Sequence, residues 1–349
     1  MKNLLQFAIL AVLLVFISSC SSTNRLTMGV TEPARIPLSS DIARIGIINR
    51  SIPSEENRVL NEIDKILSLE GKNLDKEGAE ALITGLKDEL NRGERFDKIE
   101  IISDGEAQRK GLGVFPAALS WDTVEKICKE HDVDILFSLE FYDTDTQADY
   151  EMTMVTIPNN LGIEAKVPGH KVALNTVIKN GWRIYDPVGK VILDEYTSRD
   201  YIVSRGAGIN PVKAIEAVIG RKEGVQQVSA DLGTQYGRNT KPLRRRVARD
   251  YFVRGTDNFV IAKRRAQTGD WDGAADLWER ELNNPKMKVA GRAYYNMAII
   301  NEINGDLEKA IDWASKAYSD YGNNNALGYV NILKRRAAEK RELKRQLSR

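Results

Sequence analysis

The sequence predicts an α/β fold, a mixed sheet with packed helices, followed by an all-α helical domain. Buried strands alternate with helices up to about residue 140, which is typical of a βαβ start. Strands separated by turn signals follow up to residue 205, which indicates an antiparallel meander. Helical periodicity and an internal repeat then predict an all-α domain at 255–349.

The composition is that of an ordinary globular protein. The chain has 349 residues, of which 42% are hydrophobic and 29% charged, so it is long enough for two domains. The 51 basic and 49 acidic side chains give a net charge of +2, which provides no general attraction for nucleic acid or an acidic substrate. A charge-driven partner must therefore be sought in local patches.

The first twenty residues predict a leader and a lipid anchor. A positive start at Lys2 precedes an apolar run, Leu4–Ile17, which is too short to span a bilayer but has the length of a signal-peptide core. Small residues then lead to Cys20, and this order resembles the lipobox of bacterial lipoproteins. The resemblance implies cleavage after residue 19 and acylation of Cys20. The alternative is an ordinary signal peptide with an incidental cysteine.

The residues after Cys20 predict on which membrane the protein lies and how the folded body is connected to the lipid. Acyl chains contribute about 0.8 kcal/mol per buried methylene, so several would hold the protein durably on a membrane. Ser21 rather than aspartate follows the cysteine, which by resemblance to lipoprotein sorting favours the outer membrane, facing the periplasm. Residues 20–40 are polar with two prolines and predict a tether between the lipid and the folded body.

The α/β domain is predicted at 41–205. Short apolar runs predict buried strands, and apolar residues spaced by three and four predict helices. The expected elements are a strand at 42–48, helices over 59–67 and 79–90, a strand at 98–103, a helix from Trp121 to His131 capped by Ser120, and strands at 133–141, 150–157, 171–178, 182–185 and 191–193.

A helical connector with a basic run is predicted at 206–254, because the pattern turns helical near Pro211. Four arginines in this run are predicted to form a solvated positive face for an anionic lipid, lipopolysaccharide or an acidic partner. The alternative is that they pair with local carboxylates. These arginines are Arg244, Arg245, Arg246 and Arg249.

The helical domain contains a repeat. The segment Gly269–Ala274 recurs as Gly305–Ala310, with a spacing of 36 residues, near the 34 of a tetratricopeptide (TPR) unit. The glycine suits a tight turn, the large residue fills the hairpin and the alanine lets helices approach. The predicted packing residues of this TPR-like pair are Gly269, Trp271, Ala274, Trp278, Gly305, Leu307, Ala310 and Ala317. Such surfaces bind peptides or proteins, or the pair is a buttress for the sheet domain.

No catalytic or metal motif emerges from the sequence. Cys128 and His131 lack a second pair for zinc, so a buried thiol and a helix-terminal histidine are predicted. The acidic run Asp143–Glu151 lacks the glycine and glutamate of a calcium loop, which favours an acidic turn at a strand end. The glycine cluster at 206–208 is predicted to be a loop. We therefore predict no enzyme, no cofactor and no metal.

Two family resemblances extend this interpretation. The lipobox, the segments Ile45–Ser51 and Arg95–Phe96, the block Pro242–Phe252 and the repeat resemble uncharacterised Bacteroidota-type lipoproteins with C-terminal TPR-like repeats. Residues 40–140 also resemble, distantly, the periplasmic domain of the curli secretion pore family.

The resulting hypothesis is a periplasmic, lipid-anchored scaffold or adaptor that binds a protein and not nucleic acid. The alternatives are a subunit of a curli-like secretion pore, which the second resemblance implies, and an envelope enzyme.

Overall fold

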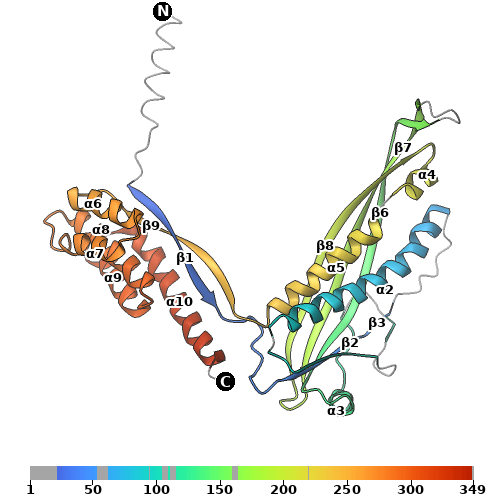
Figure 1. Cartoon of the computed structure of the whole chain (residues 1–349), viewed down its shortest axis with the longest axis horizontal. Helices are drawn as coiled ribbons and strands as arrows, with labels where there is room; N and C mark the ends of the chain where they lie inside the picture. The colour runs from blue at the N-terminus through green and yellow to red at the C-terminus, as the bar shows by residue number, and fades with distance from the viewer. Residues whose placement is uncertain are drawn as a thin grey trace, which may run out of the picture. The chain divides into compact units, whose positions relative to one another are not determined.

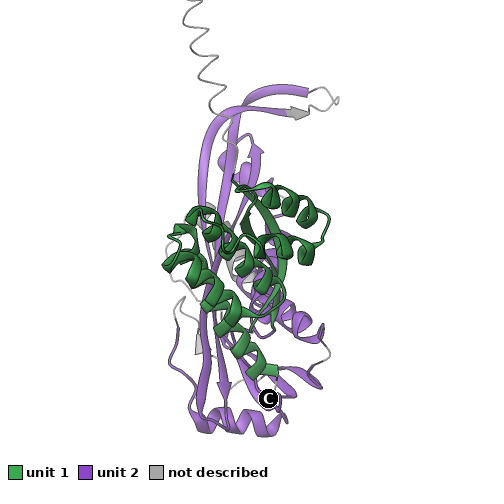
Figure 2. Ribbon diagram, turned by 90° about the vertical axis from the view of Figure 1, so that its left-hand side faces the viewer, with its two compact units in different colours: residues 1–33, 242–348 green, residues 34–241, 349 purple. Residues whose placement is uncertain are grey.

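The computed structural model describes residues 22–52, 62–93, 95–103, 109–110, 115–158, 164–218 and 220–347. They form two compact units: a helical unit, made of the chain up to Pro33 together with Pro242–Ser348, and a sheet unit, Ala34–Lys241 (Figures 1 and 2). A sheet-containing N-terminal part and a helical C-terminal region are therefore confirmed. The predicted leader and Cys20 lie outside the described residues.

The sheet unit is built on a five-stranded mixed sheet in the order β4-β2-β6-β7-β8. The strands β4, β2 and the start of β6 are parallel, whereas β6, β7 and β8 are antiparallel neighbours. This topology confirms the mixed sheet that begins parallel and continues as a meander. The strands are β2 (Arg44–Asn49), β4 (Lys98–Ile102), β6 (Ile135–Pro158), β7 (Glu164–Asp186) and β8 (Val191–Gly208), with a separate short pair, β3 (Ser51–Ile52) and β5 (Arg109–Lys110).

The last three strands are much longer than the sequence predicted. The predicted strands at 133–141 and 150–157 are parts of one strand, β6, and the acidic run Asp143–Glu151 lies inside it. The expected strand-end turn is therefore wrong, because polar residues at alternate positions fit a strand whose one face meets water. The glycine cluster at 206–208 is the end of strand β8, so the predicted loop is wrong as well. Glycine is needed at position 206 because an added Cβ would lie 2.2 Å from the carbonyl oxygen of Ala214.

Helices cover the sheet unevenly. The helices α2 (Glu62–Asn91) and α5 (Arg221–Arg238) lie along one face of the long strands (Figure 1). The other face carries α3 (Trp121–Glu130), whose predicted cap is present because the Ser120 hydroxyl accepts from the Thr123 amide at 3.2 Å. A short helix, α4 (Pro211–Glu216), packs near the ends of β7 and β8.

The helical unit combines five helices with a two-stranded ribbon among its described residues. The ribbon pairs β1 (Thr23–Glu32) with β9 (Leu243–Phe252) in antiparallel register. The helices are α6 (Asp257–Gln267), α7 (Trp271–Glu279), α8 (Met287–Ile303), α9 (Leu307–Ser319) and α10 (Asn324–Leu347).

This ribbon corrects two predictions. The 20–40 tether becomes a strand from Thr23, and the helical connector at 206–254 ends in a strand. The two strands form because they are far apart in sequence but pair with each other and pack on the helices. Leu26 of β1 is part of the hydrophobic core of the helical unit, and Asn296 forms hydrogen bonds with the end of β9. The buried Asn296 amide accepts from the Phe252 amide at 2.8 Å and donates to the Phe252 carbonyl at 2.7 Å, as a neighbouring strand would.

Candidate functional site

The repeated segments close two helical hairpins in the same way. Gly269 between α6 and α7 and Gly305 between α8 and α9 have φ of 87° and 78°, the left-handed region that favours glycine. The aspartate that follows each glycine caps the next helix: Asp270 accepts from the Gly273 amide at 2.9 Å and Asp306 from the Lys309 amide at 3.2 Å. The sequence repeat is therefore also a structural repeat.

The predicted packing residues lie where the repeat requires them. Trp278 is fully buried between the first pair of helices, and its ring centre lies 5.9 Å from that of Tyr251 on β9. Trp271 is half-buried and meets the same tyrosine edge-on at 5.6 Å. The remaining predicted packing residues are buried as well: Ala274, Leu307, Ala310 and Ala317.

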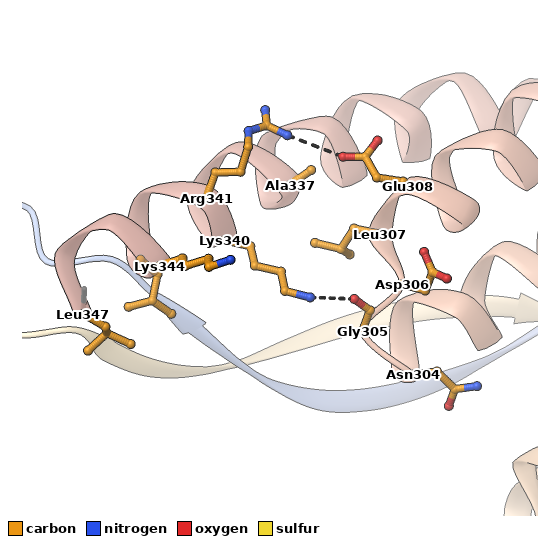
Figure 3. A pocket seen from close by; sticks show the side chains of 11 residues that line it. Asn304, Gly305, Asp306, Leu307, Glu308, Ala337, Lys340, Arg341, Lys344 and Leu347 are labelled. Atoms are coloured by element: carbon orange, nitrogen blue, oxygen red, sulfur yellow. Dashed lines mark hydrogen bonds and ion pairs between the residues drawn. The ribbon is translucent and has the colours of Figure 1, made fainter.

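The candidate site is a groove beside the last helix of this array (Figure 3). We call it the α10 groove; it has a volume of about 820 Å³ and lies between the turn from α8 to α9 and the last turns of α10. It forms because α10 has 24 residues and α9 only 13, so α10 extends past its neighbour. The residues that line it are Asn304, Gly305, Asp306, Leu307, Glu308, Ala337, Lys340, Arg341, Leu343, Lys344 and Leu347.

The α10 groove has an apolar floor and a charged rim, in which the basic Lys340, Arg341 and Lys344 outnumber the acidic Asp306 and Glu308. Leu307 and Ala337 are buried, whereas Leu347, at the end of α10, is 73% exposed. On the rim, Lys340 donates to the Gly305 carbonyl at 2.8 Å and Arg341 lies 3.5 Å from Glu308 (Figure 3). Lys344 is exposed beside them. The surface suits an apolar segment that carries an acidic side chain.

Sequence reasoning missed the α10 groove. Lysine and arginine are frequent after Lys334, but no site was assigned there. The pair Leu343 and Leu347, four residues apart and separated by basic residues, is the signal that could have indicated an amphipathic helix face.

The four arginines predicted as one positive face are divided by the strand geometry of β9. Arg244, Arg245 and Arg246 are exposed, and Arg245 lies 3.5 Å from Glu32. The side chain of Arg249, in contrast, is only 10% exposed. Its Nε and Nη2 atoms each donate to a carboxylate oxygen of Glu302 at 2.8 Å. Arg249 is therefore a structural residue, and its assignment to a partner-binding face is wrong.

A second buried charge cluster lies in the sheet unit. Arg50 pairs with Glu140, and the Tyr185 hydroxyl donates to the same carboxylate at 2.7 Å. Arg183 donates to the Pro116 carbonyl at 2.7 Å, and the Leu119 amide donates to Tyr185 at 3.1 Å. The cluster therefore fastens the segment before α3 to the sheet.

The cysteine and histidine singled out by the sequence take the predicted structural roles. Cys128 is buried in the core under α3, and His131 ends that helix with its Nδ1 3.0 Å from Glu100 Oε1. Within the described ranges no three potential metal-ligating side chains come together. None of the described helices is long and apolar enough to cross a membrane.

We expect Cys128 to be chemically silent in the folded protein. Burial raises the pKa of its thiol to about 12, so the reactive thiolate is scarce at neutral pH. In a chain carrying Cys20→Ser, maleimide labelling at pH 8 is expected to be at least about 100-fold slower than for an exposed thiol. Labelling should become fast on unfolding in urea, and Cys128→Ser should abolish it. Fast labelling of the folded chain would contradict the burial.

Comparison with known families finds two family models that match parts of the chain. A family model matches residues 42–252, more than half of the chain, and ends with the last residue of β9. The chain belongs to this family, a domain of unknown function (DUF8603). A second model, also a domain of unknown function (DUF6340), matches residues 260–335 of the helical unit. No curated protein matches the chain.

Two kinds of solved structure are remotely similar to the chain. A PelC dodecamer from Paraburkholderia phytofirmans is 9% identical with a TM-score of 0.25, over 62% of this chain and 98% of that one. A neuraminyllactose-binding hemagglutinin homolog from Helicobacter pylori is 12% identical with a TM-score of 0.27, over 57% and 88%. At these scores neither likeness carries a conclusion about this DUF8603 member, and the resemblances stated from the sequence stay predictions.

Proposed function

We propose that this DUF8603 protein is a lipid-anchored scaffold that holds a protein partner in a cell-envelope assembly and performs no chemistry itself. The observation that carries the proposal is the α10 groove, an open apolar surface at the end of a helical array with more basic than acidic side chains on its rim. Exposed apolar surface costs free energy in water, so a partner that covers it gains about 25 cal/mol per Å².

The helical array supports a TPR-like character for the unit. Two hairpins repeat with the same glycine turn and the same aspartate cap, and α10 packs on α9 as a further helix. Arrays of this kind present side chains from successive helices to a peptide. The partner segment is expected to place apolar side chains on Leu343 and Leu347 and a carboxylate near Lys344.

We infer the anchor and the location from the sequence. The order of the leader supports acylation of Cys20, and Ser21 supports the outer membrane, facing the periplasm. The partner is then another envelope protein within reach of that membrane.

Crosslinking followed by affinity purification from detergent-solubilised envelopes tests the proposal. We expect a specific partner to copurify with the wild-type chain and to be reduced at least about tenfold by Leu343→Asp with Leu347→Asp, because two buried apolar contacts are lost. Leu327→Asp with Val260→Asp is the matched control, since both residues are 46% exposed on the first turns of α10 and α6, away from the groove. Recovery of the chain alone, or equal recovery with both variants, would contradict the proposal.

A further inference from the structure

The described part of the chain begins two residues after the proposed anchor. The Ser22 carbonyl accepts from the Val253 amide at 3.0 Å, and β1 begins at the next residue. Cys20 lies two residues before Ser22, and two residues span at most about 7 Å. If Cys20 is acylated, as the proposed function requires, the end of the helical unit beside Ser22 is held at the bilayer surface.

Three basic side chains lie at this end. Arg254 is exposed and follows Val253 directly. Arg292 on α8 donates to the Arg254 carbonyl at 2.6 Å, and its guanidinium lies 5.1 Å from the centre of the Phe252 ring. Lys288 is exposed one helical turn before Arg292, on the same side of α8. We call these three residues the anchor-side patch.

The three side chains of the anchor-side patch have no carboxylate partner among the described residues. Arg25, on the nearby strand, pairs with Asp250 at 2.9 Å, but none of the three patch residues forms such a pair among the described residues. Burial lowers the pKa of Arg292, as expected for a guanidinium without a carboxylate partner. Next to Lys288, Met287 is 61% exposed. Basic residues beside an exposed apolar side chain suit the headgroup region of a bilayer.

We propose that Arg254, Lys288 and Arg292 bind anionic phospholipid headgroups and so fix how the helical unit lies on the membrane. An acidic protein is a less suitable occupant than lipid. A helix is about 10 Å wide, whereas the connection from Ser22 to Cys20 spans at most about 7 Å, so even one helix would not fit between this end of the unit and the bilayer. Each basic side chain at an anionic surface strengthens binding about fivefold, so the patch supplies about 100-fold in affinity. This inference goes beyond the α10 groove, which serves the partner.

Vesicle cosedimentation tests the patch without the anchor. The chain from residue 20 onward, carrying Cys20→Ser, is mixed with vesicles of phosphatidylcholine with or without phosphatidylglycerol. We expect salt-sensitive binding only to the anionic vesicles, weakened about 100-fold by Arg254→Gln, Lys288→Gln and Arg292→Gln together. The matched control removes three exposed charges elsewhere in the helical unit, Arg264→Gln, Lys316→Gln and Lys334→Gln. Equal losses in both triple variants, or equal binding to neutral vesicles, would overturn the proposal.

A label on the acylated protein tests the orientation. A nitroxide at Met287→Cys is expected to contact headgroups in anionic nanodiscs, whereas one at Lys309→Cys, an exposed position beside the other end of α8, stays in water. If both labels are equally accessible to an aqueous relaxation agent, the patch does not face the membrane. Incorporation of labelled fatty acid at Cys20 is measured separately, so failure of the anchor is distinguished from failure of the patch.

Discussion

Replacing Glu302 with alanine is expected to destabilise the helical unit by about 3 to 5 kcal/mol, the usual cost of removing one partner of a buried ion pair. The Glu302 side chain is fully buried and receives the Arg249 guanidinium at 2.8 Å and the Tyr329 hydroxyl at 2.7 Å. Arg336 on α10 binds the same carboxylate. One carboxylate thus joins β9, α8 and α10, and its loss leaves two guanidinium groups without a counter-charge.

Hydrogen exchange measured by mass spectrometry checks this prediction, because it reports on each unit separately. Protection should fall in peptides from α8 and α10, while peptides from the sheet unit serve as an internal reference. Glu339→Ala is the matched control on α10, since Glu339 pairs with Arg335 at 3.6 Å on the helix surface and such pairs contribute about 0.3–0.5 kcal/mol. A loss below about 1 kcal/mol for Glu302→Ala would contradict the role of the cluster.

The same carboxylate predicts a pH dependence. Burial alone would raise the pKa of Glu302, but hydrogen bonds from Arg249 and Tyr329 outweigh it and hold the pKa below its ordinary value of 4.5. The folded unit therefore binds this proton more weakly than the unfolded chain. Its contribution is complete above pH 4.5 and is lost as the pH falls through the lower folded value. Glu302→Gln should reduce the difference between the unfolding free energies of the helical unit at pH 7 and pH 4, measured by the same hydrogen exchange.

Local patterns predicted the elements that depend on neighbours in sequence. The cap at Ser120 and the repeated glycine turns follow from short-range chemistry, and the structure contains them. The mixed sheet was predicted from the order of strand and helix patterns along the chain. The α10 groove could not be predicted in the same way, because it depends on how far one helix extends past another. That difference in length appears only when both helices are packed.

The ribbon shows what a local pattern lacks. Leu26, Met28 and Val30 alternate in β1, so the signal for a strand was present, but the partner strand begins more than 200 residues later. In β9 the arginines concealed the alternation, because Arg249 counts as polar in any sequence pattern. It is nevertheless on the buried side, since Glu302 neutralises it. A residue whose burial depends on a distant counter-charge cannot be assigned from its own neighbours.

The second large effect is expected at the crossing of α2 and α5 in the sheet unit, where two glycines let the helix backbones touch. An added Cβ at Gly233 would lie 1.9 Å from the Leu82 carbonyl oxygen, and one at Gly85 would lie 2.1 Å from the Ala230 carbonyl oxygen. Backbone atoms cannot rotate away as side chains do, so the helices must separate.

We therefore expect Gly233→Ala to destabilise the sheet unit by about 2 kcal/mol or more, although alanine gains about 1 kcal/mol in helix propensity over glycine. Gly224→Ala on the same helix is the matched control: its new Cβ would meet only the Ile202 Cδ1 at 3.2 Å, a side-chain end that can move. In that variant the hydrogen-exchange protection of α2 and α5 should be unchanged or slightly higher. Once Gly233→Ala has separated the helices, adding Gly85→Ala should cost less than it does alone. Additive losses would show that the two glycines do not share one contact.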